Sequence, residues 1–349
     1  MIVYDPILNT QRVVDTIHTS SVQEILFDGQ IAYVAAQDSI VAYDLTTETR
    51  VAAARFNGVS TKSLAIFGNE LLVGNFYGQS SSNLYIYDKS SLTLIDSIAG
   101  LTKGVTSILV NGVYAYIPQN SQTLNYTDSL GYIAVVHIPN RWITDTISVP
   151  NYTEDIGQII NNPTGNSLLT INSVSNTITK VDYSNFSSAS NTLIPLDLNV
   201  GGHSQFSEHG DTLFARTANG ICALNFNDFS VVDSLVIDTV VTGFTYDTTN
   251  AKFYITQTDF FSYQLGKEYG RDGVKIKDFT VGFSPEVIRM YYGFGLSVNE
   301  KDIANNVLKV FPNPSVDYIS FDLAELNSKH AEMVPVSYTH LRAHETRGN

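Results

Sequence analysis

Short apolar runs separated by polar turns follow one another along most of the chain, and Leu72–Ile98 shows the complete pattern. Its apolar run is followed by a polar turn, a second apolar run ending in Tyr87-Asp88, a short turn, and a run ending in Asp96-Ser97-Ile98. Apolar and polar residues alternate within such runs, as in a β-strand, and the 3.6-residue spacing of an amphipathic helix is absent. The pattern therefore predicts an all-β chain.

The end of the second apolar run recurs along the sequence as an aromatic or aliphatic position followed by Asp or a substitute. The occurrences are Tyr4-Asp5, Tyr43-Asp44, Tyr87-Asp88, His137-Ile138, Val181-Asp182, Leu224-Asn225 and Tyr263-Gln264. Consecutive occurrences are 39 to 50 residues apart, as from 4 to 43 and from 87 to 137. Repeats of about 40–50 residues that hold four short strands are typical of β-propeller blades.

Four strands, named a to d from the first to the last, are expected in each repeat. In the second repeat they are expected at Ser63–Phe67, Glu70–Gly74, Asn83–Asp88 and Leu92–Ile98. A tight turn joins strands a and b, and the same turn is expected at Asp28-Gly29, Gly68-Asn69, Asn111-Gly112 and Gly165-Asn166. Gly and Asn suit these positions because they tolerate the positive φ that tight hairpins require.

Both chain ends are predicted to contribute to a seventh blade. Six complete repeats fit between about residues 22 and 282, and residues 2–17 supply only strands c and d of another. The segment Pro285–Tyr292 is expected to add a strand a to that blade. A blade built from both ends would leave no exposed edge strand. We therefore expect seven four-stranded blades, with six or eight as the alternatives.

Composition and charge limit the function classes. The formal net charge is −14, with 20 Lys and Arg against 34 Asp and Glu, which argues against a nucleic-acid or anionic-membrane partner. No run of 18 apolar residues is present, so no membrane span is expected. Cys222 is the only cysteine, so an intramolecular disulfide is impossible, and we expect this side chain to be a buried apolar group.

The repeats resemble the YVTN-type β-propeller family of bacterial and archaeal cell-surface proteins. The matching units are Tyr33–Gln37 with the following SIVAYDLTTETRV, and Leu72–Asn75 with the following NLYIYDKSSLTLIDSI; Tyr254–Gln257 is a weaker copy. The resemblance implies a propeller over residues 1–292 but no particular chemistry, because propellers host many functions. Residues 293–306 are expected to be a linker.

A second resemblance begins after the linker. Residues 307–323, VLKVFPNPSVDYISFDL, look like the start of the type IX secretion C-terminal sorting domain of Bacteroidetes. The match is carried by Phe311, Pro312, Asn313, Pro314 and Asp317, the last four being the expected sorting signal. It implies recognition by the type IX secretion machinery, export, and a place outside the cell or on its outer surface. Residues 307–335 would be an incomplete copy of this domain.

Neither end of the sequence has the features expected of a complete secreted protein. Met1–Asp5 already resembles the interior of a repeat, so we expect a signal peptide to be missing from this sequence. Residues 336–349 lose the strand alternation and are similar to translated sequencing-adapter read-through, so we interpret them as a non-native tail. A natural disordered tail is the alternative.

Six polar side chains occupy equivalent positions just after strand b. They are Gln37, Asn75, Gln119, Asn172, Thr217 and Gln257. The b–c and d–a connections share the face of a propeller where ligands usually enter, so these side chains are candidates for a ring that binds a polar ligand. The alternative is that they cap the b–c turns locally, as Asn and Thr commonly do.

The d–a connections add charged side chains to the same face. They are Lys62, Lys103, Glu154, Asp155, His203 and Glu286. We add His203 to the candidate ligand-binding residues, because it follows Gly201-Gly202 directly before a strand a. His209 and Glu208 are expected on the opposite face, so no metal site is predicted. The chain has no HExxH motif, nucleophile elbow or P-loop, and no cofactor or catalytic residue is expected.

The sequence thus predicts a secreted or cell-surface propeller that acts as a binding or interaction module for a polysaccharide, peptide or protein. The second hypothesis is an extracellular enzyme of the lyase or lactonase type, with acid–base residues meeting at the channel mouth. Convergence of His203 with Glu154, Asp155 or Glu286 would favour the enzyme. A third hypothesis is a structural component of a surface layer, which predicts self-association.

Overall fold

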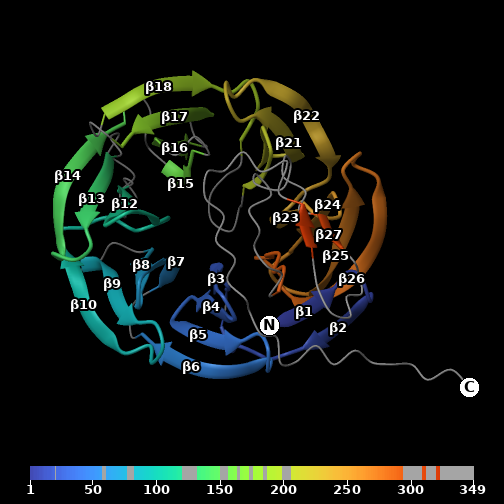
Figure 1. The fold of residues 1–349 in the computed structure, drawn as a ribbon, viewed down its shortest axis with the longest axis horizontal. Coiled ribbons are helices and arrows are strands. Elements are labelled where there is room, and N and C mark those ends of the chain that lie inside the picture. The colour runs from blue at the N-terminus through green and yellow to red at the C-terminus, as the bar shows by residue number, and fades with distance from the viewer. Residues whose placement is uncertain are drawn as a thin grey trace, which may run out of the picture. The chain divides into compact units, whose positions relative to one another are not determined.

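Six four-stranded antiparallel sheets follow one another in chain order within the unit Met1–Gly293 of the computed structural model (Figure 1). The structure describes residues 1–19, 21–56, 60–76, 82–119, 132–149, 156–162, 166–172, 176–183, 187–198, 206–293, 309–311 and 320–322. All regular elements in these ranges are strands, and no helix there is long and apolar enough to cross a membrane. The prediction of an all-β propeller with four-stranded blades is confirmed.

Each sheet is one blade, with its strands hydrogen-bonded in chain order from the inner to the outer edge. Blade 1 is β3 (Glu24–Asp28), β4 (Ile31–Ala36), β5 (Ser39–Asp44) and β6 (Thr49–Arg55). Blade 2 is β7 (Thr61–Phe67), β8 (Glu70–Asn75), β9 (Ser82–Asp88) and β10 (Leu94–Ala99). Blade 3 is β11 (Leu109–Asn111), β12 (Tyr114–Gln119), β13 (Tyr132–His137) and β14 (Trp142–Ser148).

The remaining three blades have the same strand order. Blade 4 is β15 (Ile156–Asn161), β16 (Ser167–Asn172), β17 (Thr177–Asp182) and β18 (Ser187–Leu193). Blade 5 is β19 (Ser207–His209), β20 (Thr212–Arg216), β21 (Gly220–Asn225) and β22 (Val231–Asp238). Blade 6 is β23 (Gly243–Asp247), β24 (Lys252–Thr256), β25 (Tyr263–Gly270) and β26 (Lys275–Phe283).

The prediction of a seventh blade is wrong, because the chain ends do not form a four-stranded sheet. β1 (Ile2–Asp5) and β2 (Thr10–Val13) make a separate two-stranded sheet, and residues 285–292 contain no strand. Pro285 has no N–H to give to a ladder. The side chains that follow bind neighbouring blades instead: Tyr291 packs on Phe27 of blade 1 with ring centroids 5.1 Å apart, and the Tyr292 hydroxyl accepts the Thr248 N–H.

The Asp at the end of the marked apolar run holds a tight turn in several repeats, whereas Tyr263-Gln264 lies at the start of β25 instead of at the end of a strand. Asp44 Oδ1 accepts the backbone N–H groups of residues 46 and 47, and Asp88 Oδ1 accepts those of residues 90 and 91. The residue four positions after each such turn-capping side chain has positive φ; these are Asn9, Glu48, Leu92, Arg141, Phe229 and Ala251. The expected a–b turns at Asp28-Gly29, Gly68-Asn69 and Asn111-Gly112 are also present, and their glycines have φ near +60°. Gly165 lies outside the described residues.

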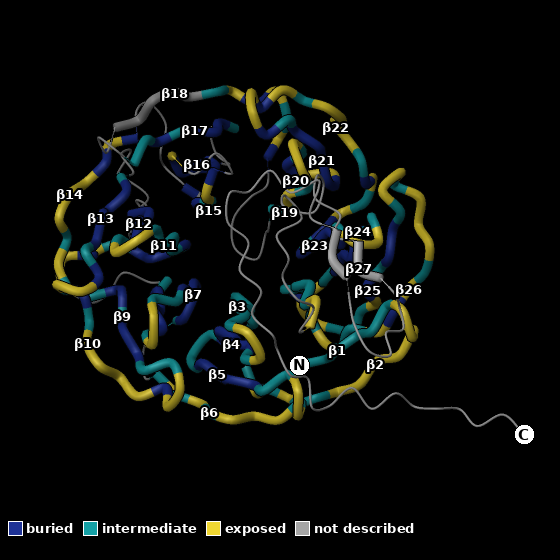
Figure 2. Tube along the Cα trace, viewed as in Figure 1, coloured by how far each residue is buried: buried dark blue, intermediate teal, exposed yellow. Residues whose placement is uncertain are grey.

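The hydrophobic core is a series of clusters between neighbouring blades. The middle strands of each blade are buried, whereas the outer strands are largely exposed (Figure 2). One cluster joins Leu72 and Ile86 of blade 2 to Ile117 and Val136 of blade 3. Cys222 belongs to the cluster between blades 4 and 5, and its burial confirms the expectation from the sequence. The first strand of each blade is thus the edge strand nearest the centre, and the buried middle strands hold it in place.

The second unit, Phe294–Asn349, contains one described sheet. β27 (Lys309–Phe311) pairs antiparallel with β28 (Ser320–Asp322). The expected sorting signal, Pro312, Asn313, Pro314 and Asp317, lies outside the described residues.

Candidate functional site

The polar residues predicted to form a ring lie at the ends of the second strands. Asn75, Gln119 and Asn172 are the last residues of β8, β12 and β16, and Gln37, Thr217 and Gln257 directly follow β4, β20 and β24. Four of them, Asn75, Gln119, Asn172 and Thr217, are buried. The placement after strand b therefore agrees with the repeat pattern, while a ligand-binding role stays a prediction.

Two of these amides hold the chain segment that enters their own blade. The Asn75 side-chain oxygen accepts the Ser60 N–H at 2.9 Å, and its amide nitrogen donates to Asn83 Oδ1 at 3.0 Å. The Gln119 side-chain oxygen accepts the Lys103 N–H at 3.2 Å. These bonds satisfy polar groups at buried strand ends, where an unpaired group would cost about 1–3 kcal/mol.

Three other members, Thr217, Gln257 and Asn172, also form hydrogen bonds close to their own strand ends. Thr217 Oγ1 accepts the Gly220 N–H at 3.1 Å, and Gln257 Nε2 donates to Thr239 Oγ1 at 3.0 Å. Asn172 Nδ2 donates to Thr177 Oγ1 at 3.0 Å, whereas its buried Oδ1 has no hydrogen-bond partner in the structure. Local capping thus accounts for most of the hydrogen-bonding groups in this set. His203, Glu154 and Asp155 lie outside the described residues, so their convergence with Glu286 stays a prediction.

A compact set of polar side chains lies where the inner strands of blades 1 and 2 meet residues 284–292. We call it the inner polar cluster; it comprises Ser21, Gln23, Glu24, Lys62, Glu286 and Arg289. β3 and β7 lie close to the centre of the ring in Figure 1. The sequence placed Lys62 and Glu286 on one face, but it missed the other four because no local motif contains them.

Lys62 and Glu286 are both buried, and each is held by hydrogen bonds. Lys62 Nζ donates to Gln23 Oε1 at 2.8 Å and lies 5.1 Å from the centre of the Phe76 ring. Glu286 Oε2 accepts the Ser21 hydroxyl, and its Oε1 accepts the Ser284 hydroxyl at 3.3 Å. Burial raises the pKa of Glu286, an effect opposed by the two serine hydrogen bonds and the charge of Lys62. Burial thus favours the protonated form of this carboxyl more than water does.

Glu24 and Arg289 form the second part of the cluster. Glu24 Oε2 accepts the Leu64 N–H at 2.7 Å, and its Oε1 lies 3.7 Å from an Arg289 guanidinium nitrogen. Burial raises the pKa of Glu24 and lowers that of Arg289, and the attraction between their charges opposes both shifts. The backbone bond to Leu64 fixes the Glu24 carboxylate against blade 2, so this pair joins residues 284–292 to the first two blades.

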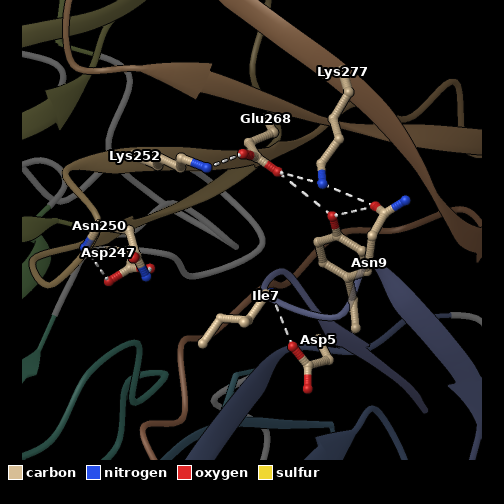
Figure 3. A network of polar contacts seen from close by, with 9 residues as sticks. Asp5, Ile7, Asn9, Asp247, Asn250, Lys252, Glu268 and Lys277 are labelled. Atoms are coloured by element: carbon tan, nitrogen blue, oxygen red, sulfur yellow. Dashed lines mark hydrogen bonds and ion pairs between the residues drawn. The ribbon is translucent and has the colours of Figure 1, made fainter.

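A different charged network occurs where β1 and β2 meet blade 6 (Figure 3). Glu268 is completely buried, and its two oxygens bind Lys252 Nζ at 2.7 Å and Lys277 Nζ at 3.3 Å. The Tyr4 hydroxyl lies 3.5 Å from Glu268 and 3.1 Å from Asn9 Oδ1, which also accepts Lys277 Nζ at 2.8 Å. Both carboxylate oxygens of Glu268 have partners, and the partners come from blade 6 and from the β1–β2 sheet, so the network holds these two parts together.

Within the described ranges, no group of three or more His, Cys, Asp or Glu side chains is arranged to hold a metal ion. The chemistry available in the inner polar cluster is therefore that of its carboxyl, ammonium, guanidinium, amide and hydroxyl groups.

Comparison with known proteins supports the fold and nothing finer. A scan against protein-family models finds no match, and a search of curated proteins finds none either. Many solved structures are similar. One is the crystal structure of the computationally designed Ika8 protein, which is 12% identical, with a TM-score of 0.53 over 77% of this chain and 78% of that one. At this identity the likeness concerns the propeller arrangement alone.

Proposed function

We propose that the protein is a binding module that holds a polar group of its ligand at the inner polar cluster. The observation that supports this proposal is that Lys62 and Glu286 are both buried, although they belong to segments far apart in the sequence. The charge of Lys62 also acts on the carboxyl of Glu286. Buried charges usually cost stability, and aliphatic side chains would fill the same space at lower cost. Perturbed ionisable groups of this kind are concentrated at functional sites.

The ligand classes that suit this cluster are polysaccharides, peptides and proteins. A hydroxyl, carbonyl or carboxylate of the ligand would accept from Lys62, and a hydroxyl or amide would bond to Glu286. The polar side chains after strand b are proposed to extend this surface toward the other blades. We further propose secretion through the type IX machinery and a place at the outer cell surface, which rests on the resemblance of residues 307–323 alone.

A second candidate function, an extracellular lyase or lactonase, is supported by the presence of the buried carboxyl of Glu286 and the buried ammonium of Lys62 in one cluster. In such an enzyme Glu286 would be the proton donor or acceptor and Lys62 would stabilise negative charge on the substrate. Two assays test this alternative. Elimination in a uronate polysaccharide is measured by the absorbance of the unsaturated product, and hydrolysis of a lactone is measured by the release of acid.

The binding proposal is tested by screening the protein against an oligosaccharide array. The best ligand of the array is then titrated into the wild type, Lys62→Met, Glu286→Gln and the control Lys275→Met. Lys275 is an exposed residue that pairs with Asp278. It lies on β26, the outer strand of blade 6, whereas the inner polar cluster lies at the inner strands of blades 1 and 2. We expect the first two variants to bind at least about tenfold more weakly and the control to bind normally. Equal affinity in all four proteins would refute the proposal.

A further inference from the structure

Exposed aromatic side chains gather at one end of blade 6. We call this surface the aromatic patch; the exposed fractions are 68% for Val240, 55% for Phe260, 83% for Phe261, 79% for Tyr263 and 57% for Phe283. Burying an aromatic side chain usually stabilises a protein strongly, so several exposed rings are unusual. Contiguous exposed apolar surface usually marks an interaction site.

Hydrogen bonds fix the turn that carries the first two aromatic rings. Asp259 Oδ1 accepts the N–H groups of Phe261 and Ser262 at 2.9 Å each, and its Oδ2 accepts the Ser262 hydroxyl at 2.7 Å. These bonds hold the pKa of Asp259 at about 2, with the Ser262 hydroxyl as the largest cause. The turn is therefore formed before any partner arrives, and little ordering entropy remains to be lost on binding.

Phe260 has φ of +66°, a left-handed conformation that is unfavourable for a residue with a bulky side chain. A glycine at this position would relieve the strain. Phe229 also has positive φ, but its ring is buried in the core, whereas the Phe260 ring faces solvent. Strain that is retained without a packing benefit points to a role for the exposed ring.

Three chain segments are fastened together to make the patch. Tyr263 and Phe283 pack edge to face with ring centroids 5.6 Å apart, and the Ser284 N–H donates to the Ser262 carbonyl at 3.1 Å. Gln257 Nε2 donates to the Val240 carbonyl, which ties the segment that enters blade 6 to the same surface. The rings therefore lie on a rigid platform rather than on an isolated loop.

The chemistry around the patch favours a basic partner. The segments 236–243 and 257–264 contain Asp238 and Asp259 but no Lys or Arg, and the one charged residue of 282–286 is Glu286, which is buried in the inner polar cluster. Asp238 and Asp259 are exposed at the rim, and the whole chain carries a net charge of −14. The half-buried Arg216 donates to the backbone carbonyls of Val241 and Thr242. Exposed rings with carboxylates at their rim attract Lys and Arg side chains through cation–π and charge interactions.

The same surroundings disfavour a neutral sugar. The hydroxyl groups next to the rings already take part in hydrogen bonds within the turn: Ser262 with Asp259, and Thr258 with Ser284 at 3.1 Å. A sugar needs several hydrogen-bonding groups beside its stacking ring. The exposed rings and carboxylates offer apolar and charged contacts to a protein segment instead.

We propose that the aromatic patch docks a protein segment that combines Lys or Arg with apolar side chains. This inference rests on the proposed function as a binding module, and it names the partner class and a surface separate from Lys62. The rings of Phe261 and Tyr263, which are the most exposed, are the anchors of the interface.

The test selects a random-peptide phage library on the full chain and measures the enriched peptides by fluorescence anisotropy. The proteins compared are the wild type, Phe261→Ser, Tyr263→Ser, Lys62→Met and the control Leu94→Ser, which changes an exposed apolar residue of blade 2. We expect peptides rich in Lys or Arg and apolar residues, at least about tenfold weaker binding to the first two variants, and normal binding to Leu94→Ser. Binding should also weaken as salt is raised.

Four results would overturn the inference. The enriched peptides would lack basic residues, or Phe261→Ser and Tyr263→Ser would bind them as well as Leu94→Ser does. Dimerisation of the wild type that Phe261→Ser abolishes would assign the patch to a second copy instead. Loss of binding in Lys62→Met together with normal binding in Phe261→Ser would support the inner polar cluster and reject the patch, so the two proposals fail separately. Thermal melting of every variant checks that folding is retained.

Discussion

The contact between blades 2 and 3 differs sharply from the contact between blade 6 and the β1–β2 sheet. The first is aliphatic, with Leu84 and Ile98 of blade 2 packed against Ala115 and Ala134 of blade 3. The second has a buried carboxylate, that of Glu268, bound by two lysines and reached by a tyrosine hydroxyl. We call these contacts the aliphatic seam and the closing seam.

The difference follows from how each seam is formed. Blades 2 and 3 are consecutive in the chain, so their faces are brought together by the connection and need only exclude water. In the closing seam, Tyr4 must find a blade that lies 264 residues later in the sequence. Apolar contact is tolerant of sliding, whereas hydrogen bonds and ion pairs accept one geometry. We infer that the charged network fixes the register of the first strands.

The largest effect is expected when both cations of the closing seam are removed. Lys252→Met with Lys277→Met leaves Glu268 completely buried without a cation, which should lower the free energy of unfolding by about 3–5 kcal/mol. Chemical denaturation measures this loss, and Lys275→Met on the same strand is the control. A double variant as stable as the wild type would show that water reaches the seam.

A smaller loss is expected from a cavity in the aliphatic seam. Leu72 is completely buried, so Leu72→Ala should lower the free energy of unfolding by about 2–5 kcal/mol in denaturant titration. The same truncation at the exposed Leu94 of this blade should cost much less. Similar losses at both positions would mean that the packing between blades 2 and 3 does not stabilise the ring.

The free energy of unfolding should depend on pH through Glu286 of the inner polar cluster. Burial raises the pKa of Glu286 above the ordinary value of 4.5, so the folded state holds this proton more tightly than the unfolded state does. The stabilisation is complete below the unfolded pKa and is lost as pH rises through the raised folded pKa. Denaturation across acidic to neutral pH should therefore show a flatter profile in Glu286→Gln than in the wild type. Identical profiles would contradict the assignment.

The smallest effect concerns Tyr254, whose buried hydroxyl has no hydrogen-bond partner in the structure. Burial raises the pKa of this hydroxyl, with a further contribution from the charge of Glu268. Tyr254→Phe removes the unpaired group and keeps the ring, so the protein should be equally stable or up to about 1 kcal/mol more stable. Tyr4→Phe, which loses hydrogen bonds to Asn9 and Glu268, is the matched variant and should be less stable.

The repeat pattern was sufficient for most of the propeller because it depends on local chemistry. Alternation marks the strands, Asp88 and its counterparts cap the turns, and Gly68 permits the hairpin. The same reasoning failed at Pro285–Tyr292, whose apolar residues resemble a strand. There the side chains of Glu286, Tyr291 and Tyr292 bind neighbouring blades, and no ladder forms.

In the candidate sites, too, some features follow from the local sequence and others only from the tertiary fold. The sequence alone determined the β-propeller class, the polar positions after strand b, and the shared face of Lys62 and Glu286. Only the tertiary structure decided that Glu286 meets Ser21, a residue 265 positions earlier, and that Phe261 and Tyr263 are exposed beside Phe283. Hydrogen bonding along a strand is set by a few neighbouring residues, whereas these contacts exist only once the blades have come together as a ring.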